Sequence, residues 1–317
     1  MSTHHTLKAQ PGTVQWGFYD AAVTPVLTIK SGDTVTVDSV SGGPESLPPE
    51  GSGFTVLPEH RDILAKAARG PGPHILTGPI AVDGAQPGDA LKIEILDIQL
   101  RQNWGFNFHR PLLGALPDDF PNARQIHIAL DGARGKARMP WGLEVPTAPF
   151  FGCMGVAPPA AWGRQTSVIP RAFGGNIDNR ELIAGTTLYL PVFHPGGLLS
   201  VGDGHAAQGH GEVNLTAIET ALTGTFRISI EKAAGLKLPR AETPTHVITM
   251  AFDVDLDQAA KIALREMIDL IGEKAGLSPE DAYALCSIAA DLVVTQVVDG
   301  NKGIHVTLPR WALAKPA

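Results

Sequence analysis

The chain has 317 residues, of which 44% are hydrophobic and 18% charged, so it can bury a sizeable core and is not intrinsically disordered. Its formal net charge of -7, with no dense run of lysine or arginine, argues against a nucleic-acid partner. The sequence also contains no run of about 18 apolar residues that would predict a membrane span. Two distant cysteines make no disulfide framework and residues 1–10 contain no apolar signal segment, so we expect a soluble, cytoplasmic protein without a membrane partner.

The first 250 residues alternate mainly with a period of two, which is typical of half-buried strands. Residues 27–29 and 34–37, joined by a turn at 31–33, predict a strand, a turn and a second strand. Residues 91–95 alternate cleanly after the turn residues 86–89. Further strands are expected at residues 186–192, 226–231 and 245–254.

Connections rich in glycine and proline separate these strands, since the chain holds 35 glycines and 26 prolines. The longest are at residues 42–53, 69–73 and 105–123. They are too frequent for a doubly wound α/β domain. The pattern therefore predicts a mainly β body.

The pattern changes near residue 255. Residues 256–275 predict an amphipathic helix, and Ser278-Pro279-Glu280-Asp281 is a good start for a second helix at 279–293. A turn at 299–303 precedes a last strand at 304–308. We expect one interwoven domain over residues 1–317, with a β-rich body at about 12–254 and a helical pair with a last strand at about 255–309.

The segment 202–212 is the richest in polar side chains that can bind metals, and it reads Gly-Asp-Gly-His-Ala-Ala-Gln-Gly-His-Gly-Glu. Apolar residues at 198–201 and 213–215 can anchor it on both sides. If the backbone is extended, Asp203 and His205 point to the same face and can share one cation. Oxygen and nitrogen ligands together suit zinc and, less specifically, other first-row metals.

A catalytic metal site also needs a third ligand and an open position for water. Glu212 is a candidate for that ligand, or for the base that takes a proton from the attacking water. Gln208 is a candidate donor to the polarised carbonyl oxygen of a substrate. The alternative is a glycine-rich turn in which Asp203 and His205 only satisfy local backbone groups.

Two other loops carry candidate residues. The turn at 174–180 contains Asp178 and can aim it into a cleft, although an Asx turn leading to the next strand explains the same residues. His74 stands between turn residues at 72–79 and is a candidate ligand or proton shuttle, or else a satisfied hydrogen-bonding group.

Cys153 offers a different chemistry, because a thiolate can attack an amide carbonyl. No adjacent base is visible in the sequence, and cysteine is often buried as a small hydrophobic residue. Cys286 is expected in the core of the second helix. The sequence contains no Gly-x-Ser-x-Gly elbow, phosphate-binding loop, dinucleotide fingerprint or serine-amidase signature.

Three motifs occur in one order: a Leu-Thr-Gly-Pro run at 76–79, a Gly-Gly-Asn-x-Asp loop at 174–178 and the segment 202–212. Together they resemble the acetamidase/formamidase family over about residues 12–309. Supporting stretches lie at 85–91, 152–158, 188–192 and 291–299. The family usually has Gly-Asp-Gly-Glu where this chain has His210, which puts the substrate preference in doubt.

The resemblance implies metal-assisted hydrolysis of short aliphatic amides, such as formamide or acetamide, to a carboxylate and ammonia. It also implies a mainly β fold with α+β additions, a jelly-roll-like β-sandwich core with a late helical pair, and a homo-oligomer. The divalent metal expected is zinc. The site residues carried over are the metal ligands Asp178, Asp203 and His205, with His74 as a further ligand or catalytic group, Glu212 as general base and Gln208 as carbonyl donor.

Three rival functions remain. A γ-lactamase or a hydrolase of larger amides would use the same site. A non-catalytic β-sandwich binding module would hold a structural cation with no open position. Thiol catalysis at Cys153 would be indifferent to chelators.

Overall fold

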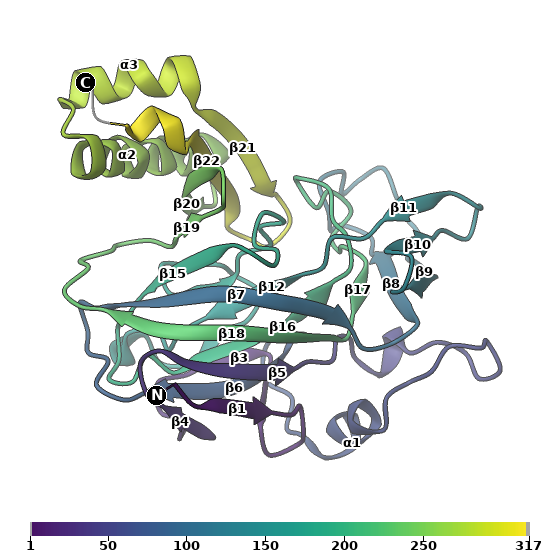
Figure 1. Cartoon of the computed structure of the whole chain (residues 1–317). Coiled ribbons are helices and arrows are strands. Elements are labelled where there is room, and N and C mark those ends of the chain that lie inside the picture. Colours follow the sequence, from purple (N-terminus) through teal and green to yellow (C-terminus); the bar gives the residue numbers. More distant parts are fainter. Residues whose placement is uncertain (1, 315–317) are drawn as a thin grey trace.

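The computed structural model describes residues 2–314, and the strands of that range are gathered mainly in two large sheets that pack face to face (Figure 1). The main hydrophobic core lies between the sheets and draws buried side chains from both of them. Phe226 of the first sheet and Phe151 of the second meet there, with ring centroids 5.6 Å apart. The expected mainly β fold is therefore confirmed.

The first sheet includes strands from both the beginning and the end of the chain. In its six-residue strand at Asp33–Asp38, buried and half-buried residues alternate, as expected for a strand with one face on a core. The order across the sheet is β1 (His4–Leu7), β5 (Asp33–Asp38), β18 (Leu222–Glu231), β7 (Ala90–Leu100), β15 (Thr187–Pro191), β19 (Arg240–Glu242), β20 (His246–Asp253), β22 (Lys302–Pro309) and β21 (Asp291–Gln296). This continuity supports the expectation of one interwoven domain, which stays a prediction; residues 1 and 315–317 lie outside the described range.

The second sheet carries the strands that frame the candidate site. Its order is β11 (Glu144–Pro146), β10 (Lys136–Arg138), β9 (Arg124–Asp131), β8 (Trp104–His109), β17 (Glu219–Thr220), β16 (Leu199–His205), β12 (Phe150–Gly155) and β14 (Gly174–Asn176). β6 (Ile75–Val82) also pairs with β16, and β2 (Val14–Trp16) and β4 (Leu27–Ile29) pair with β6. A separate pair is formed by β3 (Phe18–Tyr19) and β13 (Gln165–Thr166).

Two helices cover the β20–β22 end of the first sheet (Figure 1). α2 (Leu256–Ala275) begins where Asp255 accepts hydrogen bonds from two backbone N–H groups, and α3 (Pro279–Ala289) begins at Ser278, which accepts one from Asp281. The predicted helical pair is thus confirmed, and Cys286 on α3 is buried as expected. Short helices elsewhere are α1 (Pro58–Lys66), η1 (Pro44–Ser46), η2 (Ala160–Trp162) and η3 (Arg310–Leu313). No helix within residues 2–314 is long and apolar enough to cross a membrane.

The predicted strands at 27–29 and 34–37 are present as β4 and β5. They do not pair with each other, because β4 pairs with β6 while β5 lies in the other sheet between β1 and β18. Two local expectations were wrong. The second helix ends at Ala289, and β21 follows it, in keeping with the strand preference of the β-branched Val293, Val294 and Thr295. The expected connection at 105–123 contains most of β8, whose pairing with β9 and β17 outweighs the local glycine and asparagine.

We expect Ile271→Ala to lower the free energy of unfolding by about 2–5 kcal/mol, because Ile271 is fully buried between α2 and the sheet and its truncation leaves a cavity. Urea denaturation followed by circular dichroism measures this. Ile288→Ala is the matched control, since Ile288 on α3 is 83% exposed and its loss should change stability by no more than about 0.5 kcal/mol. Equal effects of the two changes would contradict the assigned packing of the helices.

Candidate active site

Three of the predicted site residues come together at the end of β16. Asp203 and His205 lie on that strand, and Asp178 enters from the loop after β14. The Nε2 atom of His205 lies 3.3 Å from Oδ2 of Asp203 and 4.0 Å from Oδ1 of Asp178. All three side chains are buried. Asp203 and His205 therefore lie side by side, although the backbone of Asp203 is not extended; that they share one cation stays a prediction.

The carboxylates stand on unusual backbone. Asp178, Asp203 and Glu212 have φ angles of 50°, 57° and 47°, in the left-handed region that residues other than glycine seldom adopt. Such a conformation costs of the order of 1–3 kcal/mol and persists only where the surroundings enforce it. It is concentrated at functional sites, and here it affects three residues of one cluster. No local sequence pattern indicates this strain.

A glycine on the neighbouring strand makes room for the cluster. A Cβ atom at Gly152 of β12 would lie 2.6 Å from Oδ2 of Asp203 and 2.7 Å from Cε1 of His205, and closer still to Oδ1 of Asp178. These contacts are far shorter than van der Waals distances. Gly152 is therefore the residue that lets the three side chains converge.

Two acidic residues that the sequence did not suggest complete the cluster. Glu219 of β17 places Oε1 3.2 Å from Nε2 of His205 and also accepts a hydrogen bond from the backbone N–H of Ala217. Asp299, expected only as a turn residue, is 94% buried and lines the same pocket as Glu219. Neither belongs to a local motif of ligand-type residues, so only the pairing of distant strands reveals them.

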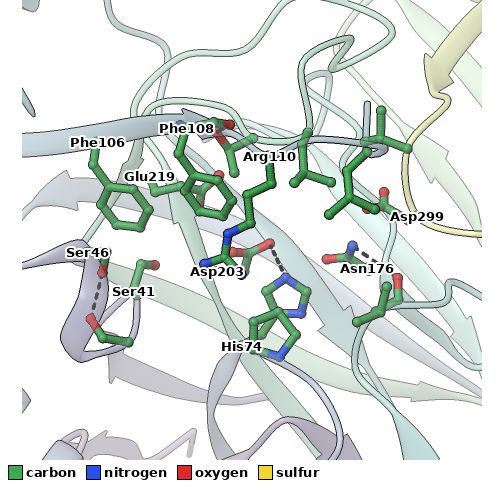
Figure 2. A pocket seen from close by; sticks show the side chains of 18 of the residues that line it. Ser41, Ser46, His74, Phe106, Phe108, Arg110, Asn176, Asp203, Glu219 and Asp299 are labelled. Atoms are coloured by element: carbon green, nitrogen blue, oxygen red, sulfur yellow. Dashed lines mark hydrogen bonds and ion pairs between the residues drawn. The ribbon is translucent and has the colours of Figure 1, made fainter. Parts of the chain in front are cut away.

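His74 lies at the edge of the cluster. Its Nε2 is 3.8 Å from Oδ2 of Asp203 (Figure 2). Its Nδ1 is 2.9 Å from Oγ of Ser167. The hydroxyl of Ser167 thus orients the imidazole toward Asp203. Whether His74 acts as a ligand or as a catalytic group stays a prediction.

Gln208 contacts the protein at both ends of its amide. Its Oε1 lies 2.9 Å from Nδ1 of His205, and its Nε2 donates to the backbone carbonyl of Asp178 at 2.8 Å. With Nδ1–H donating to Gln208, the Nε2 of His205 keeps its lone pair on the side of the carboxylates. These contacts favour a positioning role; donation to a substrate carbonyl stays a prediction.

Cys153 is an unfavourable nucleophile in this setting. Its thiol is fully buried, with Sγ 3.0 Å from Oδ1 of Asn176 and 3.8 Å from Oδ2 of Asp203. Burial, together with the charges of Asp203 and Asp178, raises the pKa of the Cys153 thiol well above its usual value. The thiolate that catalysis requires is therefore disfavoured.

The electrostatics of the cluster are dominated by buried acid groups. Burial raises the pKa of Asp178 to about 6 and that of Glu219 to about 8, with the charge of Asp203 adding to both shifts. Burial and the nearby carboxylates also raise the pKa of Glu212 and of Asp299 well above the usual range. Burial opposes the charge of Asp203 too, but His74 and His205 outweigh it and lower the pKa of Asp203.

A divalent cation fits this arrangement. Both carboxylate oxygens of Asp178, Oε2 of Glu212 and Oδ2 of Asp299 are buried without a hydrogen-bond partner among residues 2–314. Buried polar atoms are normally satisfied, so this set requires an explanation. Two triads share His205, namely Asp178–His205–Glu212 and Asp203–His205–Glu219, and within each triad the ligand atoms lie within 4.8 Å of one another. Carboxylate and imidazole donors of this kind suit zinc and related metals.

The cluster forms the polar end of a largely apolar cavity of about 260 Å³. Phe106 and Phe108 present parallel rings on one wall, with centroids 6.1 Å apart (Figure 2). The guanidinium carbon of Arg110 lies 4.8 Å from the ring centroid of Phe108. Its Nη2 lies 3.6 Å from Oε1 of Glu45. Other residues that line the cavity are Ser41, Ser46, Arg69, Ile75, Leu113, Val168, Asn176, Leu215, Thr216 and Val298.

The sequence profile of the Acetamidase/Formamidase family matches residues 17–166 and 159–311, which together are most of the chain. The chain belongs to the acetamidase/formamidase family. The formamidase of Methylophilus methylotrophus is 29% identical over 250 residues, a match that covers 59% of this chain and 61% of that formamidase. The chain therefore aligns with less than two thirds of the length of this relative.

Solved structures of the family share the fold over almost the whole chain. The crystal structure of an acetamidase from Bacillus halodurans has a TM-score of 0.83 and 31% identity, covering 96% of this chain and 97% of the other. An acetamidase from Yersinia enterocolitica has a TM-score of 0.87 and 27% identity, with coverages of 99% and 94%. The resemblance inferred from the sequence motifs is thus confirmed.

We expect Gly152→Ala to weaken the binding of a divalent cation to this cluster by roughly 10–100-fold, because the added methyl group displaces Asp178, Asp203 and His205 from one another. Calorimetric titration with divalent cations measures this, with far-UV circular dichroism to check the fold. Gly209→Ala is the matched control, since a Cβ there meets nothing within 4 Å. Unchanged cation affinity in Gly152→Ala would exclude this cluster as a cation site.

The metal-free protein should lose stability as the pH rises from about 4 to about 8. In that window the folded chain holds protons on Asp178 and Glu219, whose pKa values are about 6 and about 8, whereas the unfolded carboxyl groups titrate near pH 4. The folded state binds more protons, so the free energy of unfolding falls with pH. We expect the melting temperature of the protein stripped of metal by a chelator to be lower at pH 8 than at pH 5. This difference in melting temperature should be smaller in Glu219→Gln. A difference of the same size in that variant would show that Glu219 does not titrate as described.

Proposed function

We propose that this protein is an amidohydrolase that cleaves the C–N bond of small aliphatic amides, such as formamide and acetamide, to a carboxylate and ammonia. The observation that carries the proposal is the buried cluster of carboxylates around His205 at the end of an apolar pocket, in a chain of the acetamidase/formamidase family. Zinc as the metal, a cytoplasmic location and a homo-oligomeric assembly belong to the same proposal.

Asp178, Asp203 and His205 are proposed as the residues that hold the cation. When bound, a divalent cation supplies a Lewis acid that polarises the amide carbonyl and lowers the pKa of a water molecule. Gln208 keeps the Nε2 lone pair of His205 directed at this position through its contact with Nδ1. Glu219 places Oε1 3.2 Å from the same nitrogen, and its carboxylate can balance the charge of a bound cation.

Glu212 is proposed as the general base. Its carboxyl group lines the pocket, and its Oε2 is buried without a hydrogen-bond partner within the described range. Burial raises the pKa of Glu212, which makes its carboxylate a stronger base. Glu212 takes a proton from the attacking water and passes it to the departing nitrogen. Protonation of that nitrogen is the demanding step, because amide nitrogen is a poor leaving group until it gains a proton.

A second candidate substrate class is favoured by the size of the pocket. The cavity of about 260 Å³ and its wall of Phe106, Phe108 and Leu113 leave room for an apolar group larger than the methyl of acetamide. A hydrolase of larger amides or of a γ-lactam would use the same carboxylate cluster. Relative values of kcat/KM on formamide, acetamide and a bicyclic γ-lactam distinguish these substrates.

We expect Glu212→Gln to lower kcat by about 10² to 10⁴ without unfolding the protein, because the amide cannot accept the proton of the attacking water. Ammonia release from the best of the three substrates measures this. Glu280→Gln on α3 is the matched control, since Glu280 is exposed and far along the chain from the cluster. Near wild-type turnover in Glu212→Gln would show that the base has been assigned wrongly.

Removal of the metal should abolish ammonia release, and zinc added back should restore it, because the cluster otherwise lacks the positive charge that its carboxylates require. Metal content is measured on the same samples. Activity that survives complete removal of the metal would contradict the proposal and favour thiol catalysis at Cys153. Bound zinc without hydrolysis of any amide would instead support a non-catalytic binding module.

A further inference from the structure

A second group of ligand-type side chains lies outside the pocket. Glu181 follows β14 in the loop that contains Asp178, His210 lies in the loop after β16, and His305 lies on β22. These three come from distant parts of the chain, yet one potential ligand atom of each lies within 4.8 Å of the others. Neither the proposed hydrolysis nor the packing of the core uses them together.

The distances are close to those of a metal site. Nε2 of His210 lies 3.4 Å from Oε1 of Glu181, and the rings of His210 and His305 have centroids 5.3 Å apart. Donor atoms around tetrahedral zinc, each bound at about 2.0–2.1 Å, are about 3.3 Å from one another. Glu181 and His210 have side chains that are 38% and 34% exposed, so small rotations can close the remaining gap.

His305 supplies an independent sign of a ligand. It is fully buried, and its Nε2 has no hydrogen-bond partner among residues 2–314. Its Nδ1 lies 2.7 Å from the hydroxyl of Thr295. With Nδ1–H donating to Thr295, Nε2 carries a free lone pair, which is the arrangement in which proteins hold metal-binding histidines.

The donor atoms of the group also suit a cation. Two imidazole nitrogens and a carboxylate oxygen are common ligands of zinc. A simple ion pair between His210 and Glu181 would leave the buried Nε2 of His305 unexplained.

An ion can reach this group from solvent. Glu181 and His305 line a cavity of about 410 Å³ that is distinct from the pocket of the candidate active site. The cavity is also lined by residues of β20 and β21, including Ile248 and Val293.

We propose that Glu181, His210 and His305 bind a second transition-metal ion, with zinc favoured by the donor set, and that this ion ties together the two loops that carry Asp178 and Glu212. Glu181 lies three residues after Asp178, and His210 lies two residues before Glu212. This site is inferred from its own contacts and does not depend on the proposed hydrolysis.

The loop of His210 is already attached at this point. The N–H of Gly211 donates to the carbonyl of Thr295 at 2.9 Å, and the N–H of Val297 donates to the carbonyl of Gly211 at 3.1 Å. An ion held between His210 and His305 adds a second link between this loop and the pair of strands β21 and β22, because Thr295 of β21 also contacts His305 of β22. The backbone beside Glu212 should therefore become more rigid when the ion binds.

Zinc stoichiometry tests the site directly. The full-length protein is stripped with a chelator, reloaded with Zn²⁺, passed through gel filtration and assayed for metal by mass spectrometry. We expect His210→Asn and Glu181→Gln each to hold one zinc ion per chain fewer than the wild type. His194→Asn, the same substitution at a histidine outside the group, should hold as many ions as the wild type.

The same comparison in an Asp178→Asn background separates the two sites. The loss of one ion on His210→Asn should persist there, whether or not the catalytic position binds zinc. Equal zinc content with and without His210, in either background, would overturn the proposal. A failure of Asp178→Asn to change the zinc content would instead count against the proposed catalytic metal.

Hydrogen exchange tests the link between the loops. In the Asp178→Asn background, Zn²⁺ should slow exchange of the backbone amides of Gly211 and Glu212, and His210→Asn should remove that protection. If Zn²⁺ leaves the exchange rates of these amides unchanged, the proposed link between the two loops is overturned, even if the ion binds.

Discussion

The burial of several carboxyl groups around a single histidine is the constraint on which this structure depends. Asp178, Asp203, Glu212, Glu219 and Asp299 all lie within the folded body, and burial disfavours the charged form of each. His205 offers one positive charge at most. The cluster therefore has either to retain protons or to gain a cation, and both proton transfer and cation binding follow from that imbalance.

The fold resists this repulsion by fixing the backbone. Strand β16 is buried along its whole length and is held by β12 on one side and by β6 and β17 on the other. The left-handed conformations of Asp178, Asp203 and Glu212 are held in place by these neighbours, and Gly152 leaves the space that they share. The stability of the two-sheet core thus offsets the local cost of assembling the site.

The apolar pocket gives the charged cluster its chemical setting. Aromatic side chains from β8 form one wall of the pocket, so the polar end of the cavity lies beside apolar surface, where electrostatic interactions are stronger than in water. The loops that bear Asp178 and Glu212 extend beyond the cluster to Glu181 and His210, where they approach β22. The rigidity of the site is consequently linked to the end of the first sheet that the helices cover.

The sequence alone determined the mainly β class, the helix at 256–275, the capped start of the next helix and the family motifs, because these depend on periodicity and on residues close together in the chain. It also indicated Asp203 and His205, since both lie on one short segment. Only the tertiary structure brought in Glu219, Asp299 and Gly152, assigned β4 and β5 to different sheets, and gave Gln208 its contacts with His205. Those features arise from pairing between strands that are far apart in sequence, and no local pattern specifies which distant strand will become a neighbour.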